Sequence, residues 1–461
     1  MARWECIVCG LIYDEKEGWP DDGIPAGTKW SDVPDDWLCP DCGVGKDDFE
    51  LIPGSEGESV GEAEPDAGAS EANATSNNRH IVIVGSGLAG YGLVSGLRKL
   101  DPEVAITLIT RDGGESYSKP MISTGYTKNL SAEKLAAQSP EAMAEQLNVT
   151  MLTRKTVVSI DPSSKRLNLD DETVITYSEL VLTLGAELIR PPMGGDAADD
   201  VMGVNDLDDY RSFRDTLEAK GVRKVAVIGA GLIGCEFSND LLNGGFEVEA
   251  VDPMSWCIPT LLPEPAGRAV QAALEAKGAR FHFGPLATEV NRSATGYQVQ
   301  LNNGEHIDAD AVLSAVGVRP RTQLASSAGL DVGRGIKTNR LLETSSPGIY
   351  ALGDCAEVAG HVLVYVAPLL AAGRALAATL TGNPTEVSYP AMPVTIKTPA
   401  CPVCVSPVAK DAEGSWTLTG EGSDIKGLFH SPDGQLLGFA LTGAAVKERM
   451  ALTKELPPIL D

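Results

Sequence analysis

The sequence predicts an α/β protein with two Rossmann-like dinucleotide-binding domains and a small α+β C-terminal domain. A small four-cysteine metal module on a disordered linker precedes them. Three observations support this prediction. A glycine-rich turn between an apolar strand and a helix occurs twice, in HIVIVGSGLAG from His80 and in VAVIGAGLIG from Val225. An acidic residue, Asp252, follows the second turn at the end of the next predicted strand, and two CxxC pairs lie near the start of the chain.

The composition describes a strongly acidic globular protein. Its 461 residues carry a formal net charge of -27, and 43% of them are hydrophobic. Because nucleic acids and anionic lipids are bound by basic patches, this charge argues against both as partners. The chain starts without a leader pattern, and the longest apolar run, around Val362 to Ala372, is too short to span a bilayer. We therefore expect no membrane insertion and a cytoplasmic location.

The first glycine-rich turn predicts a phosphate-binding cradle. Ile81 to Val84 is an apolar run typical of a buried parallel strand, and the helix after the turn is stopped by Asp101-Pro102. In such turns the first glycine bends the chain, the second lets backbone N–H groups approach a pyrophosphate, and the third lets helix and strand pack closely. The helix N-terminus adds partial positive charge. The predicted phosphate-binding residues are Gly85, Ser86, Gly87, Leu88, Ala89 and Gly90.

The strand after this cradle, Val104 to Thr110, lacks the acid that often holds an adenosine ribose at such a strand end. Thr110 and Arg111 occupy that place and are the candidate cofactor-binding residues there. Their presence leaves the ribose contact open.

The second cradle predicts a nicotinamide dinucleotide site. Lys224 to Gly229 and Glu247 to Asp252 are the expected strands, with a helix over Cys235 to Gly244 between them. A carboxylate at Asp252 would accept hydrogen bonds from both ribose hydroxyls and would repel a 2′-phosphate, which favours NADH over NADPH. The alternative is that Asp252 only ends the strand. A hairpin over Tyr297 to Asp308 completes this domain. The predicted NAD-binding residues of the turn are Gly229, Gly231, Leu232, Ile233 and Gly234.

Four cysteines form two CxxCG knuckles, Cys6 with Cys9 and Cys39 with Cys42. In a cytosolic chain such pairs indicate a metal site rather than disulfides. Four thiolates make a tetrahedral site that suits iron or zinc, so the ligands alone leave a structural zinc ribbon open.

The residues around these knuckles resemble rubredoxin over the whole of residues 1–52. GWPDDGIPAGTKW and DVPDDWLCPDCGVGK are similar to rubredoxin sequences, and five aromatic residues stand where rubredoxins place a small core: Trp4, Tyr13, Trp30, Trp37 and Phe49. The resemblance implies one iron that is held by the four cysteines and transfers single electrons. Because the module is acidic, we expect it to dock on a basic rim of whatever reduces it.

Residues 53–78 contain six acidic residues and no aromatic, Lys or Arg residue, so they cannot bury enough surface to fold. This predicts a flexible tether with an r.m.s. span of about 25 to 30 Å, which would hold the module near its partner at roughly millimolar effective concentration. A spacer without a kinetic role is the alternative.

The rest of the chain resembles the two-dinucleotide flavoprotein reductases. Besides the paired cradles, LTLGA, AVGVRPRT and ALGDCAE occur in the order found in that family. YSKPM, GCEF, TPACP and LTGAAV are similar to bacterial rubredoxin reductases in particular. The expected organisation is a metal module over 1–52, a linker over 53–78, an FAD domain over 79–195 and 309–385, an NAD domain over 196–308, and a C-terminal domain over 386–461.

This resemblance implies roles for single residues. FAD is expected on the first cradle, with Asp354 on the ribityl or pyrophosphate and Lys119-Pro120 beside the isoalloxazine near N5. Pro368 is expected to open a helix that points at the flavin N1/O2 edge, and Glu236 to meet the nicotinamide side. Lys119 and Glu236 are therefore the candidate catalytic residues. Further candidates are Gly185, Arg190 and Gly353 for FAD, and Val316 and Gly317 for NAD.

The remaining cysteines are expected to be structural. No CxxxxC pair follows the first cradle, so electrons should leave directly from the flavin. Cys235, Cys257 and Cys355 are predicted to be buried, and Cys401 and Cys404 to be loop residues of the C-terminal domain, with a metal or redox role of that CPVC as the alternative.

The expected function is electron transfer from NADH through FAD to the fused rubredoxin iron and on to a terminal acceptor. CPDCGVGK resembles rubredoxins that serve membrane di-iron alkane hydroxylases, which makes such an enzyme the first expected acceptor. Oxidases that detoxify oxygen or nitric oxide are the next. Two other functions stay open, namely an NADH oxidase or peroxide-handling flavoenzyme with a structural zinc module, and a non-enzymatic docking protein.

Overall fold

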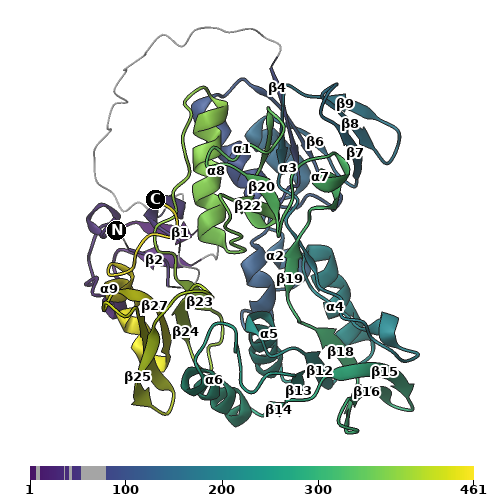
Figure 1. Cartoon of the computed structure of the whole chain (residues 1–461), viewed down its shortest axis with the longest axis vertical. Helices are drawn as coiled ribbons and strands as arrows, with labels where there is room; N and C mark the ends of the chain where they lie inside the picture. The colour runs from purple at the N-terminus through teal and green to yellow at the C-terminus, as the bar shows by residue number, and fades with distance from the viewer. Residues whose placement is uncertain (7–10, 36, 41–43, 53–54, 56–78) are drawn as a thin grey trace.

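The structure is a computed structural model that describes residues 1–6, 11–35, 37–40, 44–52, 55 and 79–461 (Figure 1). The predicted tether over 53–78 lies outside these residues, apart from Ser55. Among the described residues no helix is long and apolar enough to cross a membrane.

The first parallel sheet holds the first glycine-rich turn. Its strand order is β21-β10-β4-β5-β6, and all neighbouring pairs are parallel. Helix α1 follows β4 directly and packs against α8, where a Cβ on Gly96 would lie only 3.1 Å from the Ala377 Cβ. The predicted strand and helix of the first cradle are confirmed. The bounds are β4 His80–Val84, α1 Leu88–Leu100, β5 Ala105–Ile109, β6 Thr150–Leu152, β10 Glu179–Leu182, β21 Ile349–Ala351 and α8 Val366–Leu380.

The second parallel sheet has the order β14-β13-β12-β18 and holds the second glycine-rich turn. Strand β13 begins and ends at the predicted residues, whereas the helix after the turn begins three residues earlier than predicted. The bounds are β12 Lys224–Ile228, α5 Leu232–Asn243, β13 Glu247–Asp252, α6 Glu264–Ala276, β14 Arg280–Phe283 and β18 Ala311–Ser314.

Smaller sheets complete these two regions. The predicted hairpin is β16 with β17, which pair Gln298 with Asp308, and a further strand, β15, joins its other side. An antiparallel pair, β11 with β19, lies where the chain passes between the two parallel sheets. The bounds are β7 Val157–Asp161, β8 Arg166–Leu169, β9 Val174–Thr176, β11 Ala186–Leu188, β15 Ala287–Ser293, β16 Gly296–Leu301, β17 His306–Ala309, β19 Val318–Pro320, β20 Ile336–Thr338 and β22 Ala356–Val358. The helices in these connections are η4 Lys119–Thr124, α2 Ala132–Leu135, α3 Pro140–Leu147, α4 Leu207–Ala219 and α7 Gln323–Ser327.

The C-terminal region is an antiparallel sheet with the order β23-β24-β27-β26-β25. One prediction for it was wrong, because Cys404 lies on strand β24 rather than in a loop. After β27 the chain forms a 3-10 segment, η7, followed by one short turn of α-helix, α9. The N–H of Ala444 donates to Asp424 Oδ1, so this backbone is held by a tertiary contact. The bounds are β23 Val394–Ile396, β24 Val403–Ser406, β25 Ser415–Glu421, β26 Asp424–His430, β27 Leu436–Thr442, η7 Gly443–Glu448 and α9 Arg449–Thr453.

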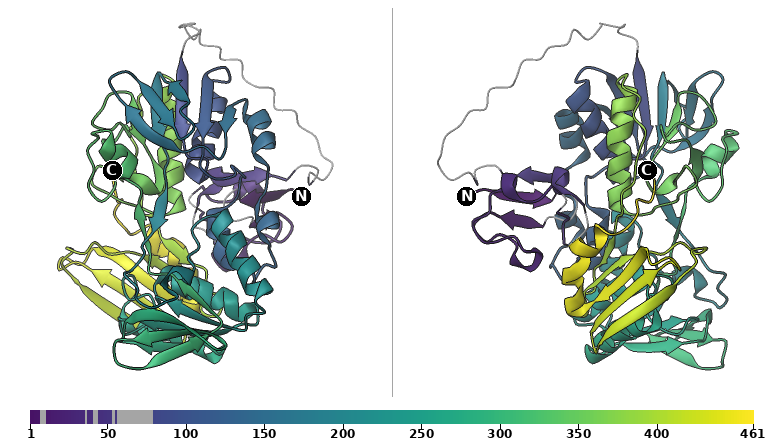
Figure 2. Two further views of the ribbon diagram at one scale, coloured as in Figure 1. Left: turned by 90° about the vertical axis from the view of Figure 1, so that its right-hand side faces the viewer. Right: turned by 60° about the vertical axis from the view of Figure 1, so that its left-hand side comes forward.

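The metal module is a small sheet of order β2-β1-β3 over an aromatic core. The five predicted aromatic residues contact one another, with Trp30 at the centre of the group, 5.2 Å from the Trp4 ring, 5.9 Å from the Trp37 ring and 4.9 Å from the Phe49 ring. The expectation that these rings form the core is confirmed. The bounds are β1 Arg3–Cys6, β2 Ile12–Asp14, η1 Pro20–Asp22, η2 Trp30–Asp32, η3 Lys46–Asp48 and β3 Phe49–Leu51. The module lies beside α8 and the C-terminal elements (Figures 1 and 2).

Candidate active site

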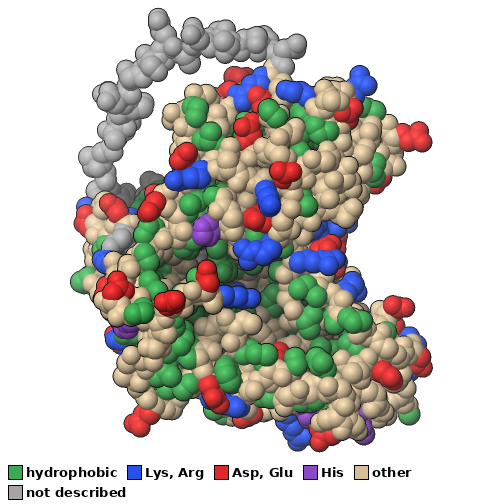
Figure 3. Space-filling model, in the orientation of Figure 1, with side chains coloured by type: hydrophobic (Ala, Val, Ile, Leu, Met, Phe, Trp, Pro, Cys, Tyr) green, Lys and Arg blue, Asp and Glu red, His purple; other side chains and the backbone are tan. Residues whose placement is uncertain are grey.

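A cavity of about 990 Å³ extends from the first cradle to α5 of the second region and to the C-terminal region. The space-filling view shows the hollow at the middle of the molecule with Lys and Arg side chains around it (Figure 3). The N-terminal turns of α1 and α8 both line it, so two helix ends with partial positive charge face the same space. A volume of this size is enough for a dinucleotide cofactor.

The first cradle has the geometry that its sequence predicts. Gly85 has φ +119°, and a Cβ there would lie 2.2 Å from the Thr183 carbonyl oxygen. A Cβ on Gly90 would lie 2.0 Å from the Gly85 oxygen, whereas a Cβ on Gly87 would meet no atom of the described residues within 4 Å. The first and third glycines are thus required by packing, and the second leaves open space for a phosphate. Ser86, Leu88 and Ala89 line the cavity with Gly85 and Gly87.

An acid that could replace the one missing at the end of β5 is Asp112, three residues after the strand ends. Its Oδ1 accepts hydrogen bonds from Thr110 Oγ1 at 2.6 Å, from the Gly114 N–H at 3.1 Å and from Ser86 Oγ at 3.3 Å. Asp112, Thr110 and Arg111 all line the cavity. Sequence reasoning missed Asp112 because it considered only the two positions directly after the strand.

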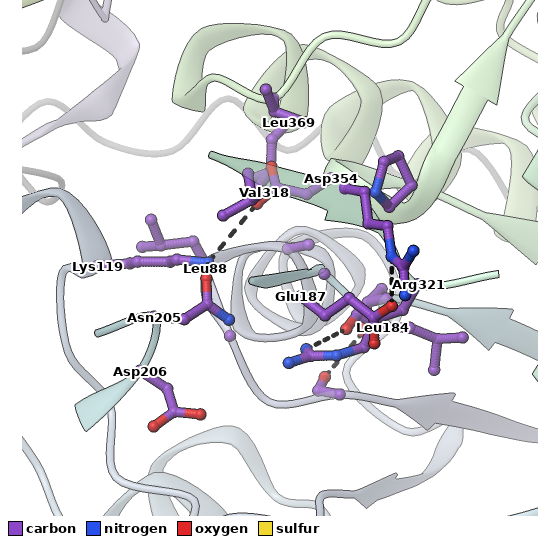
Figure 4. Close-up of a pocket in the computed structure, with 18 of the residues that line it drawn as sticks. Leu88, Lys119, Leu184, Glu187, Asn205, Asp206, Val318, Arg321, Asp354 and Leu369 are labelled. Carbon is purple, nitrogen blue, oxygen red and sulfur yellow. Dashed lines mark hydrogen bonds and ion pairs between the residues drawn. The ribbon is translucent and has the colours of Figure 1, made fainter. Parts of the chain in front are cut away.

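Lys119 reaches into the cavity from η4, where its ammonium group joins two other regions of the chain (Figure 4). Its Nζ donates to Asn205 Oδ1 at 3.0 Å and lies 3.9 Å from Asp354 Oδ2. Burial lowers the pKa of Lys119 and raises the pKa of Asp354, and the opposite charge of each partner opposes both shifts. The structure therefore brings together Lys119 and Asp354, which were predicted separately, and adds Asn205, which no sequence motif indicated.

Arg321 is a cavity residue that belongs to the motif AVGVRPRT but received no role from sequence reasoning. Its Nη1 donates to the Leu184 carbonyl at 2.9 Å, as Figure 4 shows, while its buried Nε has no hydrogen-bond partner among the described residues. This nitrogen has almost no accessible surface, so the Leu184 contact rather than a ligand fixes this side of the guanidinium. The open space at Gly87, with the positive charge of Arg321 at the wall of the same cavity, fits the phosphates of FAD.

The other predicted FAD residues divide into two groups. Pro120, Gly185, Asp354 and Pro368 line the cavity, and Gly353 packs on Ala89 of α1. The prediction that Pro368 opens α8 was wrong by two residues, because the helix begins at Val366. The proline lies in the first turn of the helix, where it removes no helical hydrogen bond. Arg190 is exposed and lies outside the residues that line the cavity.

The second cradle repeats the geometry of the first. Gly229 has φ +107°, a Cβ on Gly234 would lie 2.0 Å from the Gly229 oxygen, and a Cβ on Gly231 would meet no described atom within 4 Å. Asp252 accepts from the Ala230 N–H at 2.7 Å and from the Met254 N–H at 2.9 Å, so its carboxylate is fixed beside the glycine turn. Val316 follows the strand next to this turn, Gly317 has φ +107°, and Leu232 and Ile233 line the cavity.

Glu236 lines the cavity from α5 although only 3% of its surface is exposed. Its Oε2 accepts from Ser123 Oγ at 2.6 Å, and its Oε1 accepts from both the N–H and the Nζ of Lys397, at 2.9 and 2.8 Å. Sequence reasoning identified Glu236 but not these partners, which come from distant segments.

The metal module shows two of the four predicted ligands. Cys6 and Cys39 are buried, and the backbone N–H of each donates to the carbonyl oxygen of the residue five positions later. These acceptors are Leu11, at 2.8 Å, and Val44, at 2.7 Å. Cys6 and Cys39 thus make the same kind of backbone hydrogen bond, as expected for the first cysteines of two similar knuckles. Cys9 and Cys42 lie outside the described residues, so their part in the site stays a prediction.

Among the residues that the structure describes, three ion pairs join the module to the rest of the chain. Asp48 accepts from Arg374 of α8 at 2.9 Å, Asp21 pairs with Lys447 at 2.8 Å, and Asp22 pairs with Arg449 at 2.5 Å. The last pair is the most buried, with side-chain exposures of 0% for Asp22 and 10% for Arg449. This arrangement agrees with the expectation that acidic residues of the module meet basic residues on the part that reduces it.

The remaining cysteines are buried as free thiols: Cys235, Cys257, Cys355, Cys401 and Cys404. Burial raises the pKa of Cys355 and of Cys404 to about 12, so both are protonated at neutral pH. The expected burial of Cys235, Cys257 and Cys355 is confirmed.

Three family models match parts of this chain. Residues 79–373 match the model of the pyridine nucleotide-disulphide oxidoreductase family, residues 386–456 match the rubredoxin binding C-terminal domain, and residues 3–49 match rubredoxin.

Two relatives cover most of the reductase part. A rubredoxin-NAD(+) reductase of Alcanivorax borkumensis is 55% identical over 381 residues, which are 82% of this chain and 99% of that protein. One of Acinetobacter baylyi is 42% identical over 82% of this chain and 98% of that protein. Among solved structures, a ferredoxin reductase from Rhodopseudomonas palustris aligns with TM-score 0.73 and 26% identity over 82% of this chain and 96% of that one.

Proposed function

The chain belongs to the pyridine nucleotide-disulphide oxidoreductase family and carries a rubredoxin domain, and from this we propose that it is an NADH-dependent rubredoxin reductase joined to its own electron acceptor. The observation that carries the proposal is the docking of the metal module on the region that matches a rubredoxin binding domain, through Lys447 and Arg449. The relatives described above bear names with the same activity.

In this proposal the cavity holds FAD and the second cradle holds NADH. When bound, FAD supplies the conversion of a hydride into two single electrons. The Gly85–Gly90 turn and the N-terminus of α1 would hold the pyrophosphate, and Asp112 would accept from a ribose hydroxyl. Arg321, held by the Leu184 carbonyl at the cavity wall, would add positive charge beside the cofactor. Asp252, fixed by two backbone N–H groups, would accept from the NADH ribose, which favours NADH over NADPH.

The ammonium group of Lys119 would place a positive charge beside the reacting ring of the flavin. Asn205 and Asp354 fix its ammonium group in the cavity, so the positive charge is oriented before any substrate arrives. The N-terminus of α8 faces the same cavity and would favour negative charge that develops there. Neither group has to exchange a proton for this role.

The four cysteines would hold one iron, and the docked module would receive electrons at close range from the reductase part. We propose a membrane di-iron alkane hydroxylase as the terminal acceptor, supported by the resemblance of the second knuckle to rubredoxins that serve such enzymes.

An anaerobic visible spectrum before and after addition of NADH tests the whole proposal. The flavin bands and the ferric-thiolate bands are both expected to bleach, because the flavin passes electrons to the docked iron. Bleaching of the flavin alone would reject reduction of the module, and no bleaching with NADH would reject the reductase itself.

Replacing Lys119 by alanine is expected to slow flavin reduction by NADH while leaving the FAD content nearly unchanged. The loss of one preorganised charge near the reacting atoms costs on the order of 100-fold in rate. Stopped-flow absorbance at the flavin band measures the rate, and the bound flavin released by denaturation measures the content. An unchanged reduction rate would remove Lys119 from the mechanism.

A further inference from the structure

The Glu236 carboxylate lies where three parts of the chain meet. Its own helix, α5, follows the second cradle, Ser123 belongs to the η4 segment that also carries Lys119, and Lys397 directly follows β23 of the C-terminal sheet. All three residues line the cavity. The orientation of this carboxylate therefore depends on two residues from outside its own region.

Lys397 is held in this place by more than its side chain. Its N–H and its Nζ both donate to Glu236 Oε1, and three residues onward the Ala400 N–H donates to Asn239 Oδ1 at 3.0 Å. Glu236 and Asn239 are three residues apart on α5 and so lie on the same face of the helix. The segment that carries Lys397 is thus attached to α5 at two successive points.

The charge of Lys397 is matched to a buried carboxylate. The side chain of Glu236 is 4% exposed and that of Lys397 is 18% exposed. An ionised carboxylate at this depth needs a cationic partner and hydrogen bonds to both oxygens, which Lys397 and Ser123 provide. Lys119, another lysine of the cavity, is occupied with Asn205 and Asp354 instead.

We propose that Lys397 is a positioning residue for hydride transfer, which acts by fixing Glu236 at the nicotinamide side of the cavity. This inference rests on the proposed NADH-dependent activity. It adds that the C-terminal region, which carries the docking residues Lys447 and Arg449, also supplies a side chain that completes the nicotinamide site.

Lys397→Met keeps the backbone donor to Glu236 and removes only the charged one. A misplacement of about 1 Å near reacting groups costs on the order of 100-fold in rate, so we expect flavin reduction by NADH to slow by at least about tenfold. Two measurements on the full chain accompany the rate: the affinity for NAD+ by isothermal titration calorimetry, which should fall, and the FAD content, which should not change. Lys410→Met is the matched control, because Lys410 is an exposed lysine of the same region.

Lys397→Arg separates a positioning role from a general structural one. An arginine keeps the positive charge, so this variant should recover most of the NAD+ affinity and rate, whereas Lys397→Gln should not. In the double variant Glu236→Gln with Lys397→Met, the second change should add little, because its effect passes through Glu236. If Lys397→Met loses FAD, the NAD+ affinities and reduction rates of the Lys397→Arg and Lys397→Gln variants decide whether Lys397 has a positioning role.

Equal NAD+ affinity and equal rates in wild type, Lys397→Met and Lys397→Gln would overturn the inference while leaving the proposed function intact. Additive losses in the double variant would also overturn it. Failure of the wild-type protein to be reduced by NADH would instead reject the proposed function.

Discussion

Arg449→Met is expected to release the metal module from the reductase part and to slow internal reduction of its iron by about 100-fold, because breaking a buried ion pair costs about 3 to 5 kcal/mol. Asp22 has no exposed side-chain surface in the docked state, and its Oδ2 also accepts from Trp37 Nε1 at 2.9 Å. Without the guanidinium, the docked state keeps a buried carboxylate with no cation beside it. The module can avoid this cost by undocking, which returns Asp22 to water.

Single-turnover reduction of the iron after mixing with NADH measures this effect. Lys447→Met is the matched control, because the Lys447–Asp21 pair is more than half exposed on both sides and such pairs contribute at most about 1 kcal/mol. Iron reduction should therefore be nearly normal in Lys447→Met and slow in Arg449→Met, with equal flavin reduction in both. Equal rates of iron reduction in the two variants would show that the buried pair does not hold the module.

Cys39→Ser is expected to abolish reduction of the metal centre while NADH still reduces the flavin. Loss of an outer-shell partner alone lowers metal affinity by about 10 to 100-fold, and loss of a thiolate ligand should exceed that. Iron analysis and the ferric-thiolate absorbance measure the first result, and anaerobic bleaching of the flavin measures the second. Cys401→Ser is the matched control, since Cys401 begins a similar CPxC segment and is buried as a free thiol.

The same variant separates the proposed function from the oxidase alternative. If the module were structural zinc, the wild-type protein would contain zinc, and aerobic NADH turnover would persist in Cys39→Ser at the wild-type rate. If the module instead accepts electrons from the flavin, Cys39→Ser should no longer pass electrons from NADH to an external acceptor that oxidises the module.

The elements around both cradles could be predicted because their sequence signals are local. A run of apolar residues, three spaced glycines and a stop at Asp101 define β4 and α1 within about twenty residues, and the glycine contacts explain why no other residue fits at Gly85 or Gly90. The C-terminal sheet was harder to predict. Cys404 was expected in a loop, yet its strand β24 pairs it with Leu441 of β27, and this contact between distant residues places it in the sheet.

The candidate site shows the same division. Lys119, Asp354 and Glu236 were identified from motifs, yet the partners that orient them were not. Asn205 is 86 residues from Lys119, and Lys397 is 161 residues from Glu236, so no spacing in the sequence links them. Asp112 could have been found, because an acid three residues after the strand can still reach Ser86 of the first cradle.

The three ion pairs of the docking interface join residues that are 326, 426 and 427 positions apart. A ribosome adds about 5 to 20 residues per second, so it reaches Lys447 and Arg449 roughly 20 to 90 s after it has made Asp21 and Asp22. During synthesis the module therefore exists before its docking surface does. The module can therefore take up its metal before the surface on which it docks has been made.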